Sequence, residues 1–317
     1  MSSIQSFSKF IKKILEYRFF WANLAIIVAV VLWGLSFVSM KIIMNTGLPP
    51  YSMITMRYLL VSVVLLMVFV FQWKKPQWKR ARKDYLLFFW SGGIGITAYF
   101  LFEAKGISLT TASNAAIIIA MVPVFSLIAD WVFFRQSFNL IQLAGIILSI
   151  FGVYVIFYSS QRPVDTSAQP LLGNLLMLGA CFCWVAYSVL SKALHRKYGS
   201  FVITSYQSFF GTLLLLPFAL VESSSWVPIS LQVWGHLFYL SLLCSILAYY
   251  LYNIALRILG VTIVSVYVNL IPLVGVIGAV YYLHDPVFPL QIFGGSFILI
   301  SLFLVNQKKK QPILIAS

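Results

Sequence analysis

One stretch of the chain decides its fold: Glu103-Ala-Lys-Gly-Ile-Ser-Leu-Thr-Thr-Ala-Ser-Asn-Ala-Ala-Ile-Ile-Ile-Ala-Met-Val-Pro123. A carboxylate ends one apolar run, a patch of small residues follows, and a second apolar run is broken by Pro123. Small residues let helices approach closely inside a membrane, and a proline frees a backbone carbonyl that can face a cavity. The pattern therefore predicts the lining of a path through a bilayer.

This arrangement occurs twice in the chain. Pro123 corresponds to Pro272 at an offset of 149 residues, and the same offset relates Gly106 to Ala255, Gln142 to Gln291 and Gly145 to Gly294. Trp33 with Lys41 matches Trp184 with Lys192 at an offset of 151 residues. If each half contains five spanning helices, an odd number, the halves are inserted in opposite senses. Inverted repeats are typical of secondary transporters, with the solute site near the midplane between the halves.

The composition requires a lipid environment. Of the 317 residues, 61% are hydrophobic and 9% are charged, whereas a soluble domain carries about 25% charged residues. No packed core of this length could hide so much apolar surface from water, so we predict a polytopic membrane protein. The net charge of +15 comes from basic residues in short loops and tails, which set membrane orientation, and we expect no nucleic-acid partner.

The hydropathy pattern predicts an all-α fold of ten transmembrane helices in two inverted five-helix repeats, since a spanning helix needs about 20 apolar residues. The predicted spans cover residues 22–44, 51–73, 85–105, 110–134, 140–158, 171–194, 201–221, 233–255, 261–283 and 288–306. The repeats are residues 22–158 and 171–306, followed by a basic tail, 307–317. Residues 1–21 form a basic amphipathic segment, expected as a short helix on the membrane surface, with a disordered tail as the alternative.

The basic residues predict the orientation. With both termini in the cytoplasm, only four of the 22 Lys and Arg residues lie on the outer side, namely Lys41, Arg57, Lys105 and Arg162. The positive-inside rule favours this orientation and an even number of spans. The expected location is the cell membrane.

Several motifs together carry a family resemblance. The first half contains Trp33-Gly-Leu-Ser-Phe-Val-Ser-Met-Lys41, Pro49-Pro50 followed by Arg57, Thr111-Ala-Ser-Asn-Ala-Ala116 with Pro123, and Gln142-Leu-Ala-Gly145 ending at Gly152. Their second-half echoes are Trp184 to Lys192, Pro272, and Gln291 to Gly294. In order, spacing and duplication they resemble the EamA-type members of the drug/metabolite transporter superfamily over nearly the whole chain. The resemblance implies ten helices in two inverted halves and export of a small metabolite.

One position departs from the family pattern. The loop after the fourth helix often contains a Glu in the family, whereas this chain has Gln136 there and Asp285 at the matching place of the second half. If that acid has a role in the family, it is at most half present here.

Glu103 is the candidate for proton coupling. A charged carboxylate near hydrocarbon is costly, so its neutral form is favoured and its protonation could be coupled to transport. The repeat offset places Tyr252 at the matching position, so the acid is not duplicated, as expected of a site that serves one solute. The alternative is a carboxylate at the outer interface that pairs with Lys105 or Arg57. Lys41 and Arg57 flank the first outer loop, where they could attract anionic solutes or snorkel to the headgroups, and we expect them to snorkel.

Aromatic and polar side chains are predicted to line the solute cavity. They recur at helical spacing within apolar helices, where such residues either join helices or face a cavity. Rings with hydroxyl and amide groups suit a small-molecule substrate such as an amino acid, a nucleoside or a lipophilic compound. The predicted substrate-binding residues are Trp33, Tyr99, Asn114, Trp184, Tyr187, Tyr249, Tyr252, Asn253, Ser265 and Asn269, and Pro123 and Pro272 are predicted helix breaks.

The sequence therefore predicts a gradient-driven exporter that works by alternating access, without a cofactor, as a monomer or homodimer. An antiporter of phosphorylated sugars or nucleotide-sugars is the alternative within the superfamily, and it would need basic residues in the cavity. The alternative from another class is a membrane-embedded enzyme acting on a lipid-linked substrate. The chain contains no Gly-x-Ser-x-Gly elbow, no His-Glu-x-x-His and no phosphate-binding glycine loop, which argues against an enzyme.

Overall fold

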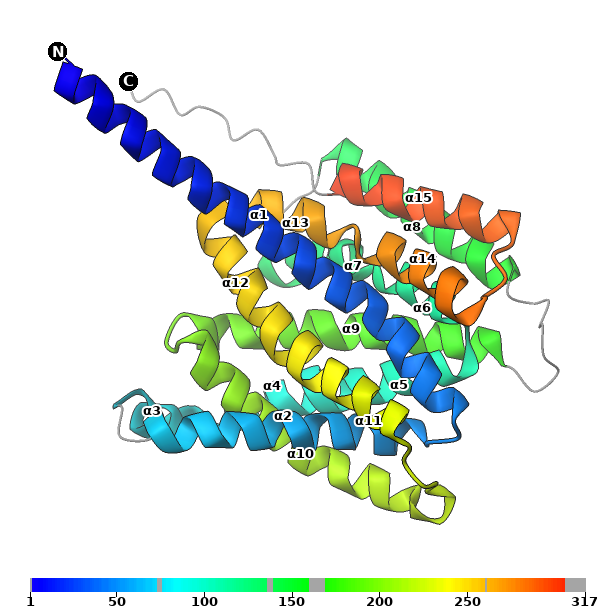
Figure 1. Cartoon of the computed structure of the whole chain (residues 1–317). Coiled ribbons are helices and arrows are strands. Elements are labelled where there is room, and N and C mark those ends of the chain that lie inside the picture. Colours follow the sequence, from blue (N-terminus) through cyan, green and yellow to red (C-terminus); the bar gives the residue numbers. More distant parts are fainter. Residues whose placement is uncertain (1, 73–75, 136–138, 160–168, 260, 306–317) are drawn as a thin grey trace.

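The computed structural model describes residues 2–72, 76–135, 139–159, 169–259 and 261–305, and all elements in these ranges are helical (Figure 1). The first half contains α1 (Ser2–Asn45), α2 (Pro50–Gln72), α3 (Pro76–Ala81), η1 (Arg82–Asp84), α4 (Tyr85–Gly92), η2 (Gly93–Ala98), α5 (Tyr99–Leu109), α6 (Ala112–Ile119), α7 (Val122–Phe134) and α8 (Leu140–Ser159). The second half contains α9 (Pro170–His195), α10 (Ser200–Val221), η3 (Ser223–Ser225), α11 (Leu231–Phe238), η4 (Tyr239–Leu247), α12 (Ala248–Leu259), α13 (Val261–Val268), α14 (Ile271–Leu283) and α15 (Pro289–Val305).

Within the described part of the chain, seven helical segments are long and apolar enough to cross a membrane, so this is a multi-pass membrane protein. They are Arg18–Asn45, Pro50–Phe71, Arg82–Leu109, Ala112–Phe133, Pro170–His195, Ser200–Val221 and Leu231–Leu256. Three shorter apolar helices, Leu140–Ile156, Ile271–Leu283 and Pro289–Val305, lie at the predicted fifth, ninth and tenth spans. The all-α prediction is confirmed, while the count of ten spanning helices stays a prediction.

The N-terminal segment differs from the expectation. α1 runs as one helix from Ser2 to Asn45, and its N-terminal end projects beyond the other helices (Figure 1). Residues 2–21 therefore continue into the first spanning helix instead of forming a separate short helix. The physical reason is that residues 1–33 contain no Gly or Pro, so nothing in this part of the sequence ends the helix.

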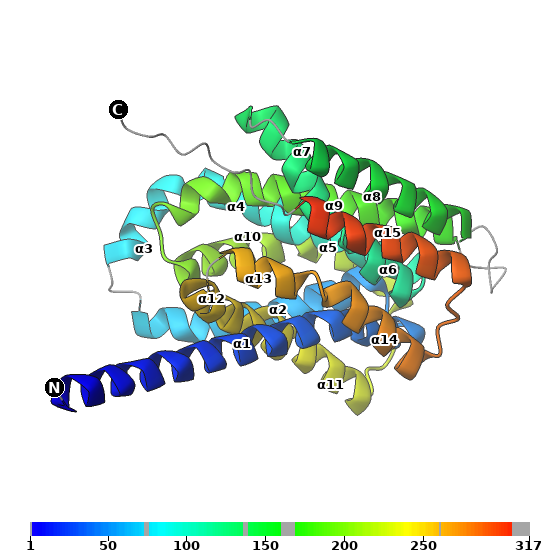
Figure 2. The same ribbon diagram turned by 90° about the horizontal axis from the view of Figure 1, so that it is seen from above.

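The equivalent helices α8 and α15 lie side by side and cross antiparallel (Figure 2). A Cβ atom built on Gly145 would lie 3.2 Å from the Ser301 carbonyl oxygen, and one built on Gly294 would lie 2.7 Å from the Gly152 carbonyl oxygen. The repeat offset of 149 residues relates Gly145 to Gly294 and Gly152 to Ser301. The two contacts are therefore equivalent, as a two-fold relation between the helices requires. Equivalent helices that point in opposite directions mean that the two halves are oppositely oriented.

α2 and α10 show the same relation at another place. The Thr55 hydroxyl donates to the Leu215 carbonyl at 3.3 Å, and the Thr212 hydroxyl donates to the Tyr58 carbonyl at 3.2 Å. Residue numbers therefore rise along α2 while they fall along α10. The two halves meet through this helix pair, through α8 with α15, and through further pairs such as α5 with α9 and α1 with α14.

Each half contains two irregular places at matching positions. The helix is interrupted between α6 and α7 and again between α13 and α14, so that Pro123 and Pro272 are each the second residue of the following helix. The π-helical segments η2 and η4 interrupt the preceding helix of each half. Inside a bilayer, irregular backbone is tolerated where it is buried in protein or lines a cavity. A solute site is therefore expected near these segments.

We predict that Gly152→Ala destabilises the protein. The added methyl group would lie 2.7 Å from the backbone oxygen of Gly294, and overpacking of this kind costs about 1–3 kcal/mol. The measurement is thermal unfolding in detergent. Gly235→Ala is the matched control, because a Cβ atom there meets nothing within 4 Å. Equal melting temperatures for the two variants would contradict the close crossing of α8 and α15.

Candidate functional site

Lys41 of α1 holds the C-terminal end of α5. Its Nζ donates hydrogen bonds to the carbonyl oxygens of Ile107 at 2.9 Å, Ser108 at 3.3 Å and Thr110 at 2.7 Å. The last carbonyls of a helix have no partner within the helix, and lipid supplies none. Lys41 therefore completes the end of α5 inside the protein, and the expectation that it snorkels is wrong.

Asp285, in the loop after α14, caps the start of α6. Its Oδ2 accepts hydrogen bonds from the backbone N–H and from the hydroxyl of Ser113, both at 3.2 Å. The Thr111 hydroxyl accepts a further hydrogen bond from the N–H of Asn114 at 3.1 Å. A carboxylate at a helix N-terminus is favourable, so this acid has a scaffold role. Gln136, at the matching place of the first half, lies outside the described residues.

Gln142 completes a capping box with Asn139, whereas Gln291 makes only one half of such a box, because Phe288 has no side-chain acceptor. Gln142 Oε1 accepts from the Asn139 N–H at 3.0 Å, while Asn139 Oδ1 accepts from the Gln142 N–H at 2.8 Å; Gln291 Oε1 accepts from the Phe288 N–H at 2.8 Å. The Gln291 amide also donates to Asn114 Oδ1 at 2.9 Å. Asn114, which we expected in the solute cavity, is therefore bound into the contact between the halves.

Glu103 lies in the interior on α5. Its side chain is 5% exposed, and the Tyr99 hydroxyl donates to its Oε1 at 2.8 Å. Its Oε2 is buried without a hydrogen-bond partner among the described residues. Arg57 interacts with Glu103 electrostatically, but the two form no ion pair within 4.0 Å. Because a buried polar atom without a partner is costly, Oε2 is open to a proton or a cationic group.

Arg57 of α2 is buried too, so the expectation that it reaches the headgroups is wrong. It is 5% exposed, and its Nε and Nη2 donate to Ser245 Oγ at 3.1 and 2.9 Å. Its guanidinium carbon lies 4.8 Å from the centre of the Phe100 ring, a cation–π contact. The Phe100 ring in turn packs on Tyr99 at 4.7 Å between centroids. The buried cation and the buried carboxylate therefore lie beside the same aromatic rings.

Three of the predicted substrate residues form one aromatic row across α5 and α9. Tyr99 packs on Trp184 at 5.4 Å between ring centroids, and Trp184 packs on Tyr187 at 5.5 Å. The Tyr187 hydroxyl donates to Gln207 Oε1 at 3.2 Å. One end of the row therefore contacts Glu103 through Tyr99, and the other end is fixed by α10.

A second aromatic group joins α1 to η4 and α12. Trp33 packs on Tyr249 at 5.1 Å and on Tyr252 at 5.6 Å, and its Nε1 donates to the Cys244 carbonyl at 3.0 Å. η4 supplies both this carbonyl and the Ser245 hydroxyl that accepts from the buried guanidinium. π-helical turns are frequent at functional sites. Tyr249 interacts electrostatically with Arg57 and with Glu103, so this second group also lies near both buried charges.

For two of the remaining predicted residues the structure shows other surroundings. Asn253 Nδ2 donates to a carbonyl of its own helix at 2.8 Å, and Asn269 is 8% exposed at the break before α14. The side chain of Ser265 lies outside the described residues. Sequence reasoning missed Arg57 and Ser245 as site residues. The available signal for Arg57 was a charge placed several residues inside a predicted span.

Two oppositely oriented helical halves with buried polar groups between them are an arrangement found in many membrane transporters. The model of the EamA-like transporter family matches residues 20–158 and 171–307, one match in each half. The chain therefore belongs to the EamA-like transporter family, and the resemblance found in its sequence is confirmed.

Similar proteins cover nearly the full chain. An uncharacterized transporter of Archaeoglobus fulgidus is 32% identical over 290 residues, which is 91% of this chain and 98% of that protein. The uncharacterized transporter YetK of Bacillus subtilis is 26% identical over 318 residues, 98% and 96% of the two chains. A probable terminal-alkyne amino-acid exporter of Streptantibioticus cattleyicolor is 26% identical over 291 residues, 90% and 93% of the two chains. A solved crystal structure with 15% identity and a TM-score of 0.57, covering 90% of this chain and 96% of its own, shares the fold.

We predict that Ser245→Ala destabilises the protein by about 1–3 kcal/mol, because it leaves a buried guanidinium without this acceptor. Unfolding in detergent, followed by circular dichroism, measures the loss. Ser296→Ala is the control, since its exposed hydroxyl donates to a carbonyl of its own helix. If the two variants have the same free energy of unfolding, the hydrogen bonds from Arg57 to Ser245 do not stabilise the protein.

Proposed function

We propose that this protein is a secondary transporter that exports a small zwitterionic metabolite, an amino acid, across the cell membrane. The observation that carries the proposal is the pair Arg57 and Glu103, two buried and opposite charges that do not pair with each other. An amino acid complements them, because its carboxylate binds a guanidinium and its ammonium binds a carboxylate. The surrounding rings, such as Tyr99 and Trp33, would pack against its apolar side chain.

Other substrate classes use this site less completely. A nucleoside or a lipophilic compound would use the rings but would leave one or both charges unpaired, which is costly. A phosphorylated sugar would need several free cations, whereas the Lys41 ammonium is bound to the carbonyls at the end of α5. A lipid-modifying enzyme finds no support in the names of the relatives, which are transporters. The name of one relative, an amino-acid exporter, supports the same substrate class.

The proposed mechanism is alternating access with proton exchange at Glu103. From the cytoplasm, the substrate ammonium binds the charged carboxylate; after the two halves rock, an external proton displaces the ammonium. The protonated, neutral carboxylate then returns to the cytoplasmic side, because an empty charged one would stay buried without a partner. The proposed topology is ten spans with both termini in the cytoplasm. The oppositely oriented halves support this mechanism.

We expect Glu103→Gln to abolish the dependence of transport on the pH gradient. The amide cannot exchange a proton, so the variant would equilibrate substrate without accumulating it. In the assay, proteoliposomes are incubated with a mixture of small molecules, with and without a pH gradient. Mass spectrometry then measures which molecules have entered the lumen and in what amount. Glu222→Gln is the control, since that carboxylate accepts hydrogen bonds from Ser52 at the start of α2. A Glu103→Gln variant that still accumulates substrate with the gradient would refute the coupling role.

Arg57→Gln should remove the preference for a carboxylate. We expect the wild-type protein to bind an amino acid more tightly than the amine that lacks only the carboxyl group. Hydrogen bonds to a charged group contribute about 1.5–3 kcal/mol, so the preference should fall by roughly tenfold or more. This preference is measured by the inhibition of transport that each compound causes as a competitor. The Arg57→Lys variant should keep part of the preference. A wild-type protein that does not distinguish the two compounds would overturn the zwitterion proposal.

A further inference from the structure

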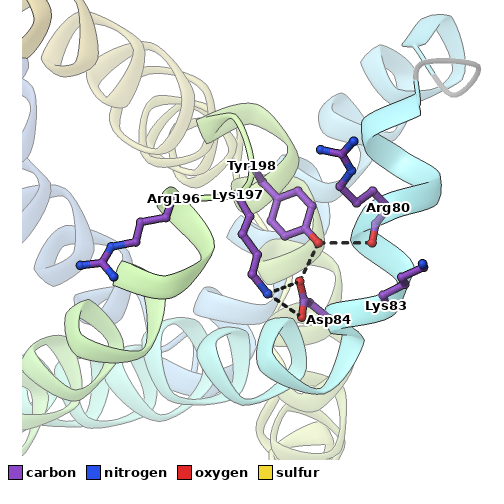
Figure 3. A pocket seen from close by; sticks show the side chains of 6 residues that line it. All are labelled: Arg80, Lys83, Asp84, Arg196, Lys197 and Tyr198. Atoms are coloured by element: carbon purple, nitrogen blue, oxygen red, sulfur yellow. Dashed lines mark hydrogen bonds and ion pairs between the residues drawn. The ribbon is translucent and has the colours of Figure 1, made fainter.

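A basic pocket lies where the turn between α9 and α10 meets α3 and η1 (Figure 3). Its volume is about 530 Å³, and it is lined by Arg80, Lys83, Asp84, Arg196, Lys197 and Tyr198. Lys197 Nζ lies 3.1 Å from Asp84 Oδ2, and the Tyr198 hydroxyl donates to the same oxygen at 2.6 Å. In the described part of the chain, Arg80, Lys83 and Arg196 meet no carboxylate within 4.0 Å. Three positive charges of this pocket therefore have no counter-charge.

An apolar groove lies close to this pocket, between α2 and α10. Its volume is about 230 Å³, and its walls include Leu65, Leu66, Phe69, Tyr206 and Phe209. Leu66 and Phe209 are each 59% exposed on helices that cross the membrane. A groove with such walls on a lipid-facing surface suits a hydrocarbon chain.

α3 joins the two cavities. Arg80 of the basic pocket and Trp78 of the groove are two residues apart on this helix. The Tyr198 hydroxyl oxygen lies 3.2 Å from the Arg80 carbonyl oxygen, and the Tyr206 hydroxyl donates to the Trp78 carbonyl at 3.4 Å, while both tyrosine rings contact Phe88. A polar and an apolar cavity are therefore both lined by side chains of the same short helix.

Trp78 carries the second, independent sign of a ligand. Its side chain is 4% exposed and lines the groove, and its Nε1 is buried without a hydrogen-bond partner among the described residues. Buried N–H groups nearly always have an acceptor, so one that lacks a protein partner indicates an acceptor from outside the chain. An indole N–H next to an apolar wall is suited to the ester region of a lipid.

We propose that the two cavities together bind one molecule of an anionic phospholipid. Its phosphate lies among Arg80, Lys83 and Arg196, one acyl chain lies in the groove, and an ester carbonyl accepts from Trp78 Nε1. The basic loops at this end are those that the positive-inside rule assigns to the cytoplasm, whose leaflet attracts basic segments through its anionic lipids. A free phosphate would use the basic pocket alone and leave the Trp78 Nε1 unsatisfied.

The test is native mass spectrometry of the full chain in detergent, titrated with phosphatidylglycerol or with phosphatidylcholine of the same acyl chains. We expect a preference for phosphatidylglycerol, and Lys83→Gln/Arg196→Gln should weaken its binding by roughly tenfold, as two lost charge contacts predict. The control Arg18→Gln/Arg82→Gln removes two exposed cations outside the pocket. It should bind phosphatidylglycerol as the wild-type protein does.

A groove variant separates a lipid from a free anion. Ser205 lines the groove, so Ser205→Trp should fill it while the cations stay in place. Weaker binding of phosphatidylglycerol to a variant with a native circular dichroism spectrum supports the proposal. Three outcomes would each overturn the proposal. The first is unchanged binding of phosphatidylglycerol to Ser205→Trp, and the second is an equal loss of binding in the pocket variant and the control charge variant. The third is displacement of phosphatidylglycerol by inorganic phosphate.

Discussion

The break between α5 and α6 exists inside a membrane protein because charged side chains from distant parts of the chain complete its hydrogen bonds. Lys41 binds the carbonyls that end α5, and Asp285 binds the N–H and the hydroxyl of Ser113 at the start of α6. Each charge matches the partial charge of the helix end that it meets. The break is therefore held from both halves, and it fixes the end of the helix that carries Glu103.

Repetition and asymmetry separate scaffold from site. Several duplicated residues have structural roles: Gly145 and Gly294 let α8 and α15 cross, and Gln142 and Gln291 each accept a hydrogen bond from the backbone N–H three residues earlier. The buried acid is not duplicated, because Tyr252 stands at the position that matches Glu103. A scaffold with two-fold symmetry can move between two states that are related by the two-fold axis. The solute between its halves, in contrast, needs different partners on its two sides.

Local signals in the sequence predicted the helical fold and the position of most interruptions. Proline and small-residue patterns act within a few residues, so they can be found without tertiary information. The contact of Asn114 with Gln291 could not be predicted, because the two residues are distant in the sequence and nothing near Asn114 indicates it. Arg57 was missed because a cation near a predicted helix end can bind a lipid headgroup as well as a buried acceptor. The acceptor, Ser245, comes from the other half of the chain, so only the tertiary structure decides between the two.

The π-helical segments also bear on the history of the chain. A π turn corresponds to one residue inserted into an α-helix, and such an insertion is normally costly because it disturbs the regular ladder. η2 occupies residues 93–98, and the repeat offset moves this range onto 242–247, within η4. The simplest history places the insertion in a single ancestral half, before that half was duplicated. Of its two descendants, η4 now carries the acceptor for Arg57, so an inherited irregularity has become specialised in one copy.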